Sequence, residues 1–236
     1  MVDDALISGI EISYVYPDGT LGFDTLSVKI RRGERVALIG PNGCGKSTLM
    51  MVLAGLLKPK TGKVLIEGEE ISKNIDTVRR RMGFVFQDPD IFLFNPSVED
   101  ELRYSLDQLD IDDDRASELL DQYSRIFELE KIMSKPPFRL SGGEKKRVEL
   151  ASVLIYSPEI LFLDEPTANV DGKTRRKILE ILNSYPGTLI FSTHELDVAE
   201  KIADRVLLMS VEKRIILDGG VDLLRERSLL EEVGVI

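Results

Sequence analysis

Hydrophobic and polar residues alternate near the start of the chain, and apolar residues gather in short runs further along. The alternation in "ISGIEISYVY" predicts a half-buried β-strand over 7–16, ended by the turn residues Pro17-Asp18-Gly19. "LSVKI" at 26–30 is suited to be its antiparallel return. Short apolar runs with polar flanks predict more deeply buried strands. These runs are 35–40, 63–68, 83–87, 159–164, 188–194 and 205–209.

Helical patterns dominate the middle of the chain, from Asp88 to Ser157. The stretch "SVEDELRYSLDQL" (97–109) begins with Ser97 as a candidate N-cap and has acidic residues in its first turn. "DRASELLDQYSRIFEL" (114–129) has helical periodicity, and Pro136-Pro137 closes the section. Two further helices, over 172–185 and 195–204, are predicted between the later strands.

Strands and helices that alternate along a chain predict a largely parallel sheet. We therefore expect one α/β domain over 1–236, with an antiparallel β part at its N-terminal end. In this interpretation 1–87 and 158–236 form the core around the mostly parallel sheet. Residues 88–157 form a helical subdomain that is inserted into this core.

Composition and charge narrow the functional classes. Of the 236 residues 43% are hydrophobic and 31% charged, as in soluble globular proteins, and the net charge is −10. This acidic balance argues against a nucleic-acid partner, because non-specific binding draws its affinity from cationic groups. Neither a membrane span nor a signal peptide is evident. Cys44 is the only cysteine, so no intrachain disulfide is possible, and we expect a cytosolic protein.

A phosphate-binding loop is expected directly after the strand at 35–40. "GPNGCGKST" at 40–48 fits the pattern Gly-x-x-x-x-Gly-Lys-Ser. Its glycines allow backbone N–H groups to face phosphates, Lys46 supplies a cation and Ser47 an oxygen for Mg²⁺. An ordinary glycine-rich turn is the alternative, but the strand before and the helix after favour a nucleotide. The expected contacts are Gly40, Pro41, Asn42, Gly43, Cys44, Gly45, Lys46, Ser47 and Thr48.

A pair of carboxylates, Asp164-Glu165, follows the buried run "ILFL". Alone, such a pair is most often an ordinary strand end. Beside a phosphate-binding loop, the first carboxylate can hold Mg²⁺ directly or through water. The second can polarise an attacking water. We therefore predict Asp164 as a metal ligand and Glu165 as the catalytic base.

A second glycine-rich helix start is present at 140–144, with the sequence "LSGGE". Together with the loop, the carboxylate pair and a histidine after a later strand, it resembles the signature motif of the ATP-binding cassette (ABC) family. The resemblance covers nearly the whole chain and implies a P-loop ATPase that uses ATP and Mg²⁺. In that family two cassettes pack head to tail, so Ser141, Gly142 and Gly143 are expected to serve the partner's ATP. A plain helix cap is the alternative.

The resemblance assigns roles to four other residues. Tyr16 matches the aromatic residue that stacks on adenine, although its alternation with Ile12 and Tyr14 also fits a core residue. Gln87 matches the glutamine that reaches Mg²⁺ or the attacking water. Asp171 matches the aspartate of the D-loop. His194, the only histidine, matches the residue that senses the γ-phosphate.

Cys44 lies inside the phosphate-binding loop, near a helix N-terminus and Lys46. Such surroundings lower the pKa of a thiol and raise its reactivity. We therefore expect N-ethylmaleimide to label this residue and to inactivate the ATPase by crowding the phosphates.

Several branches of the ABC family do not fit a chain with a single phosphate-binding loop and only short inserted helices. A separate transport subunit or a soluble assembly ATPase of the iron–sulphur type remains. "FQDPDIFLFNPSVEDEL" (86–102) and the end of the chain (227–236) resemble the cobalt/nickel and energy-coupling-factor vitamin importers. That resemblance implies a second cassette chain, identical or different, and integral membrane subunits. The chain is then expected at the cytoplasmic face of the membrane.

Overall fold

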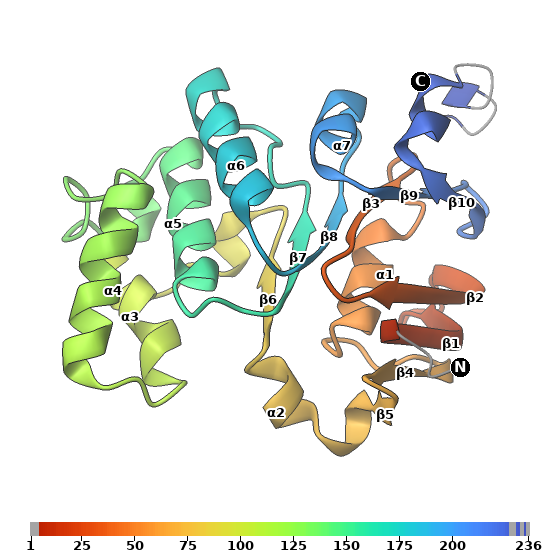
Figure 1. Cartoon of the computed structure of the whole chain (residues 1–236), viewed down its shortest axis with the longest axis horizontal. Coiled ribbons are helices and arrows are strands. Elements are labelled where there is room, and N and C mark those ends of the chain that lie inside the picture. Colours follow the sequence, from red (N-terminus) through yellow and green to blue (C-terminus); the bar gives the residue numbers. More distant parts are fainter. Residues whose placement is uncertain (1–4, 227–229, 232–233, 235–236) are drawn as a thin grey trace.

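The structure is a computed structural model that describes residues 5–226, 230, 231 and 234. In this part of the chain two β-sheets and seven α-helices are present (Figure 1). One sheet has four strands in the order β2-β1-β4-β5, and the other has six in the order β10-β9-β3-β8-β7-β6. The predicted features of the last ten residues fall mostly outside the described residues.

The four-stranded sheet is antiparallel, as expected for the N-terminal part. In the six-stranded sheet the pairs among β9, β3, β8, β7 and β6 are parallel, and β10 joins β9 antiparallel. The strands are β1 (Ala5–Val15), β2 (Leu21–Arg31), β3 (Arg35–Ile39), β4 (Thr61–Ile66), β5 (Glu69–Glu70), β6 (Met82–Val85), β7 (Ile160–Asp164), β8 (Thr188–Ser192), β9 (Arg205–Met209) and β10 (Ile215–Gly220).

The helices lie largely where the periodicity predicts them. Ser97 caps α3 by accepting the Asp100 N–H at 3.1 Å, as its position before an acidic turn indicates. The helices are α1 (Lys46–Leu53), α2 (Ile75–Arg79), α3 (Val98–Asp107), α4 (Asp113–Ile126), α5 (Gly142–Leu154), α6 (Gly172–Ser184) and α7 (Leu196–Ile202). Short 3₁₀ turns occur at Ile71–Lys73, Pro89–Ile91, Pro137–Arg139 and Val221–Arg225.

Alternate side chains of the parallel strands enter two different cores. In β3, Val36 and Leu38 pack with β1, β2, β4 and α1, whereas Ala37 and Ile39 pack with the helices on the other face. The other central strands alternate in the same way. Because both faces are covered, these strands read in the sequence as continuous apolar runs.

Helices α3, α4 and α5 lie together at one side of the molecule, and β1, β2 and β4 lie at the opposite side of the same view (Figure 1). Helix α5 packs on both α3 and β6, so the helices contact the six-stranded sheet directly. Their division from the core as a separate subdomain remains a prediction.

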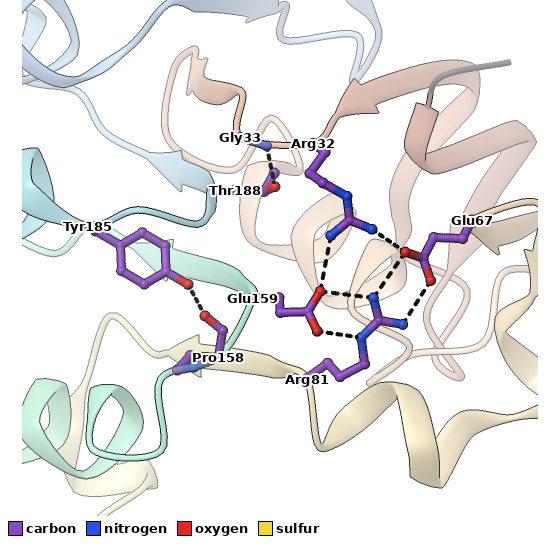
Figure 2. Close-up of polar contacts among 8 residues, drawn as sticks. All are labelled: Arg32, Gly33, Glu67, Arg81, Pro158, Glu159, Tyr185 and Thr188. Atoms are coloured by element: carbon purple, nitrogen blue, oxygen red, sulfur yellow. Dashed lines mark hydrogen bonds and ion pairs between the residues drawn. The ribbon is translucent and has the colours of Figure 1, made fainter.

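A cluster of four charges joins the two sheets at the ends of their strands (Figure 2). Arg81, just before β6, donates to Glu67 at 2.8 Å and to Glu159 at 2.9 Å, and Arg32 also contacts both carboxylates. Hydrogen bonds from Arg81 hold the pKa values of Glu67 and Glu159 below their usual range. The cluster's contribution to stability is therefore present at neutral pH and is lost as the pH falls through those depressed values.

Candidate functional site

The phosphate-binding loop connects β3 to α1, and its glycines are required by its geometry. Gly43 and Gly45 have φ angles of +78° and +102°, a region that other residues rarely adopt. A Cβ atom on Gly45 would lie 2.4 Å from the carbonyl oxygen of Gly22. One on Gly40 would lie 2.4 Å from the carbonyl oxygen of Met209. The loop thus packs closely against β2 and β9, and this packing fixes the start of α1.

A cavity of about 470 Å³ opens beside this loop. It brings together predicted residues from the end of β1, the loop itself, the segment after β6 and the end of β7. Its lining is Tyr16, Thr20, Leu21, Gly22, Asn42, Gly43, Gly45, Lys46, Ser47, Thr48, Gln87, Asp164, Glu165 and Lys213.

Lys46 lies over the loop with its side chain buried. Its ammonium nitrogen donates to the carbonyl oxygens of Gly40 at 2.8 Å and Pro41 at 3.1 Å. These two bonds hold the cation in the cavity, where a phosphate oxygen can compete for its donors. Lys46 therefore lies at the cavity wall, and its contact with phosphates remains a prediction.

The carboxylate pair sits at the end of β7, where β8 ends beside it. Ser192 connects the two acids, because its hydroxyl donates to Asp164 at 2.5 Å and accepts the Glu165 N–H at 3.0 Å. Asp164 and Glu165 are buried, with 7% and 5% of their surfaces exposed. Glu165 has a φ of +47°, a strained conformation for a residue with a side chain. Its backbone is thus held in an unusual conformation at the wall of the cavity.

His194 lies beside Glu165, a contact that the sequence did not predict. Its Nδ1 is 2.9 Å from Glu165 Oε2, while its side chain is 59% exposed. Both residues line a second cavity of about 660 Å³ that also contacts Gly40, Pro41 and Asn42 of the loop. The imidazole can therefore orient the carboxylate from the open side of the site.

Tyr16 is half-buried and does not join the core. Its hydroxyl is 2.8 Å from Thr48 Oγ1, and its ring meets Tyr14 edge-on with ring centroids 5.0 Å apart. The ring is thereby held at the wall of the cavity, next to the start of α1. This placement is compatible with stacking on a nucleotide base.

The oxygen atoms in the cavity fit Mg²⁺ well. Ser47, Gln87 and Asp164 offer a hydroxyl, an amide and a carboxylate, the ligand types that Mg²⁺ prefers. Mg²⁺ is usually held by a few such groups together with substrate phosphates, rather than by a cage of protein ligands. In keeping with this, the described residues contain no cluster of three or more His, Cys, Asp or Glu side chains suited to a metal.

The signature residues do not line the cavity of the phosphate-binding loop. Ser141 caps α5 in a capping box: its N–H and hydroxyl both donate to Glu144 Oε2, at 2.8 and 2.7 Å. Ser141 and Gly142 are exposed, and neither lines the cavity beside the chain's own loop. A Cβ on Gly143 would lie 3.2 Å from Asp171 Oδ2, so there is little free space for a side chain at this position.

Asp171 is likewise outside the nucleotide cavity and caps α6. Its Oδ1 accepts the N–H groups of Lys173 and Thr174 at 2.8 and 3.0 Å, and its Oδ2 accepts the Thr174 hydroxyl at 2.7 Å. The hydroxyl and then the backbone bonds lower the pKa of Asp171 to about 2. The residue is therefore ionised under all ordinary conditions and holds the segment before α6 in place.

Comparison with known proteins agrees with this geometry. The family described as ABC transporter matches residues 23–168. A relative from Archaeoglobus fulgidus, assigned as an ABC transporter ATP-binding protein, is 54% identical over 98% of both chains. The chain belongs to the ABC transporter family.

Two further similar proteins belong to named transporter systems. The energy-coupling factor transporter ATP-binding protein EcfA of Methanothermobacter thermautotrophicus is 37% identical over 95% of this chain and 74% of its own length. The solved structure of CbiO1 from Clostridium perfringens, part of the complex CbiONQ, is 34% identical. It covers 99% of this chain and 96% of its own, with a TM-score of 0.80. The fold is therefore that of a P-loop ABC ATPase, and the predicted ATP hydrolysis is confirmed.

The predicted lowering of the Cys44 pKa is wrong. The side chain is 1% exposed and belongs to the hydrophobic core between the sheets. Burial raises the pKa of the thiol above its ordinary value, and this outweighs the opposing charge of Lys46. The loop turns Cys44 inward, against Gly40, where a Cβ would lie 2.8 Å from the sulphur. Only the backbone of Cys44 is therefore available to a nucleotide.

We accordingly expect N-ethylmaleimide to react slowly with the native ABC ATPase. Only the thiolate attacks the reagent, and a buried thiol with a raised pKa forms little of it near pH 7. Labelling in native buffer should be at least about tenfold slower than in guanidinium chloride. Mass spectrometry over time measures both rates. Rapid stoichiometric labelling of the native chain, blocked by MgATP, would instead support the sequence-based prediction of a reactive Cys44 beside the phosphates.

The sequence did not predict all residues of the site: Thr20, Leu21, Gly22 and Lys213 also line the nucleotide cavity, and Ser192 contacts the carboxylates. Ser192 precedes Thr193-His194, and the parallel pairing of Asp164 with Ser192 brings it to the carboxylates. The sequence does offer a signal for this contact: parallel strands end at the same edge of a sheet, so residues at the ends of neighbouring strands lie close together. Lys213 reaches the nucleotide cavity from the turn between β9 and β10, where it donates to the Leu21 carbonyl oxygen. Nothing in the local sequence indicates that long-range contact.

Proposed function

We propose that this chain is the ATP-hydrolysing subunit of an importer for a small solute. The solute is a metal ion such as cobalt or nickel, or a vitamin, and it crosses the membrane through separate integral subunits. The observation that carries the ATPase part is the cavity that joins Lys46, Ser47, Asp164 and Glu165. The likeness to EcfA and CbiO1 supports the import part. The assembly-ATPase alternative is not favoured, because the relatives described above carry transporter names.

We propose the following catalytic roles, which the shared cavity supports. Lys46 binds the β- and γ-phosphates, and Tyr16 stacks on adenine. Ser47, Gln87 and Asp164 would hold Mg²⁺, which would neutralise charge on the phosphate oxygens. Their oxygen atoms line one cavity, which supports a shared ligand.

Glu165 accepts the proton of the attacking water in this scheme. A buried carboxylate at the cavity wall is placed for general-base catalysis once the water and phosphate are aligned. His194, 2.9 Å from Glu165, holds the carboxylate in its orientation and contacts the γ-phosphate. Asp171 keeps the neighbouring loop in place through the cap of α6.

A second copy of this chain, or a different cassette chain, completes the site in our proposal. Ser141, Gly142 and Gly143 form an exposed helix start that lies outside the cavity of their own loop. The N–H groups of such a helix end attract anions. In a head-to-tail dimer they would contact the phosphates bound by the partner.

The membrane subunits are proposed to dock on an aromatic groove. This groove, of about 540 Å³, lies between β6, α3 and α5, and Phe94 and Tyr104 at its rim are 66% and 43% exposed. Exposed aromatic clusters of this kind mark interaction sites. No helix in the described part of the chain is long and apolar enough to cross a membrane. A docked position at the cytoplasmic face of the membrane follows from this proposal. The groove is lined by Leu56, Asp76, Arg79, Arg80, Phe84, Phe86, Phe92, Phe94, Tyr104, Ser105, Gln108, Leu109, Val153 and Tyr156.

Replacing Phe94 with aspartate tests the docking. The chain should be co-expressed with the membrane proteins encoded beside its gene, and the complex purified in detergent. A charge within an aromatic contact should weaken the complex by about tenfold or more. The exposed Ile216, on the edge strand β10, provides a matched control as Ile216→Asp.

Uptake of labelled cobalt, nickel or vitamins by cells that express the complex then identifies the solute. Uptake should require ATP hydrolysis by this chain. Co-purification with soluble assembly proteins, and no complex with membrane subunits, would overturn the importer proposal.

A further inference from the structure

Two charged side chains are fully buried on α5, the helix that begins at the signature motif. Lys146 is 2% exposed and Glu149 is 0% exposed, and their Nζ and Oε2 atoms are 3.0 Å apart. A buried ion pair is costly to desolvate and is often no more stabilising than apolar residues of similar size. Stability alone therefore gives little reason for this pair.

Both side chains bind the same short piece of main chain. Lys146 Nζ donates to the carbonyl oxygens of Phe86 at 2.5 Å and Gln87 at 3.3 Å. Glu149 Oε1 accepts the N–H of Phe86 at 2.7 Å. Burial raises the pKa of Glu149, and the ammonium of Lys146 opposes that rise. One turn of α5 thus binds three polar groups of two consecutive residues.

These two residues face different surfaces. Phe86 lines the aromatic groove, and Gln87 lines the nucleotide cavity. The main chain between them therefore sets the direction of both side chains. A shift of this backbone would alter the groove and the nucleotide cavity together.

The far end of the same segment is held in a similar way from α3. Glu101 is 1% exposed, and its Oε2 accepts the N–H groups of Phe94 at 3.0 Å and Asn95 at 2.8 Å. Buried carboxylates from two packed helices therefore fix residues 86 and 94–95. The segment between these points is attached to α3 and α5 rather than being a free connection.

We propose that Lys146 and Glu149 are positioning residues for Gln87. They tie its main chain to the helix that carries Ser141, so that Gln87 and Ser141 move as one body. Gln87 serves this chain's own ATP, whereas Ser141 serves the ATP of the partner chain. This inference rests on the proposed role of Gln87 as a ligand of Mg²⁺ or water, and on the shared sites.

A double-mutant cycle tests the inference. Lys146→Met removes the bonds to the Phe86 and Gln87 carbonyls, and Gln87→Ala removes the side chain that those bonds position. For each variant and for the double variant we would measure kcat, KM for ATP and the Mg²⁺ concentration that gives half-maximal turnover. Lys146→Met should raise that Mg²⁺ concentration by about tenfold, as does loss of other groups that orient metal ligands. In a chain that already carries Gln87→Ala, Lys146→Met should not raise this Mg²⁺ concentration further.

Hydrogen exchange in the nucleotide-free chain gives a readout that does not depend on turnover. The Phe86 amide is bonded to Glu149, whose position Lys146 supports, so Lys146→Met should speed exchange in the peptide that contains residues 86–87. The control is Lys201→Met, which removes an exposed helical lysine that pairs with Asp197 at 3.1 Å. It should change neither exchange at 86–87 nor the Mg²⁺ requirement.

A variant without an unpaired buried charge separates the loss of positioning from destabilisation of the fold. Lys146→Met leaves Glu149 buried without its cation, so Lys146→Met combined with Glu149→Gln provides a neutral pair of similar size. If Gln87→Ala itself leaves both kcat and the Mg²⁺ requirement unchanged, the proposed role of Gln87 is wrong, and the inference falls with it. If Gln87→Ala raises the requirement but the neutral pair does not, only the positioning inference is overturned. Additive effects in the cycle would overturn it as well.

Discussion

Glu165→Gln is expected to abolish ATP hydrolysis while ATP and Mg²⁺ still bind. The amide keeps the size of the carboxylate and its contact with His194, but it cannot accept a proton from water. Loss of a general base typically lowers turnover by about 100- to 10,000-fold. Because the dimer would then hold ATP that it cannot hydrolyse, an ATP-bound dimer should accumulate. Phosphate release and size-exclusion chromatography with ATP measure the two effects.

The strained backbone of Glu165 does not confuse this test, since glutamine and glutamate differ little in their backbone preferences. Glu180→Gln makes the same change at an exposed position of α6 and should leave turnover near the wild-type rate. Turnover at the wild-type rate by Glu165→Gln would show that another residue is the general base.

Mixing two inactive variants is expected to restore ATP hydrolysis. A Lys46→Ala chain lacks the cation of its own phosphate-binding loop, and a Ser141→Arg chain blocks the site that it offers to a partner. Each variant alone forms dimers with two damaged sites. A mixed dimer has one site built from the intact loop of one chain and the intact Ser141 of the other. An equal mixture should recover about a quarter of wild-type turnover, since half the dimers are mixed and one of their two sites is intact.

Ser141→Arg also removes the cap of α5, which costs about 1 kcal/mol of stability. Ser97→Arg is the matched control, because the Ser97 hydroxyl oxygen accepts the backbone N–H three residues later, as the Ser141 hydroxyl oxygen does in α5. Thermal unfolding of both variants separates loss of the cap from loss of the site. Wild-type turnover by either Lys46→Ala or Ser141→Arg on its own would show that the sites are not shared between chains.

Much of this fold is evident from the sequence because the central strands are buried on both faces. Their apolar runs are distinctive, and the glycines of the phosphate-binding loop leave a pattern at fixed spacing. Strand β10 and the short α2 were not predicted. The sequence "IILDGG" of β10 lies at the edge of the sheet, with only partial burial, so it lacks a clear apolar pattern. Its pairing depends on β9, which no local signal shows.

The direction of individual side chains was harder to predict than their place in the chain. Cys44 shares a loop with Lys46, and only the three-dimensional turn of the backbone decides that the thiol faces the core. Lys146 and Glu149 lie in the stretch "EKKRVEL", which reads as a solvated helix face. Both are buried because the loop after β6 passes over that face of α5. Such contacts join residues about sixty positions apart, beyond any local pattern.

The central strands, which supply alternate side chains to two cores, also determine how the protein unfolds. Neither core can open alone, because each central strand contributes to both and would expose Val36 and Leu38, or Ala37 and Ile39, to water. The central sheet should therefore unfold cooperatively, as one unit. Helices α3 and α4 contribute buried residues only to the core on one face of the sheet, so their opening requires less surface to be exposed. The region around the groove can thus change conformation while the nucleotide-binding sheet remains folded.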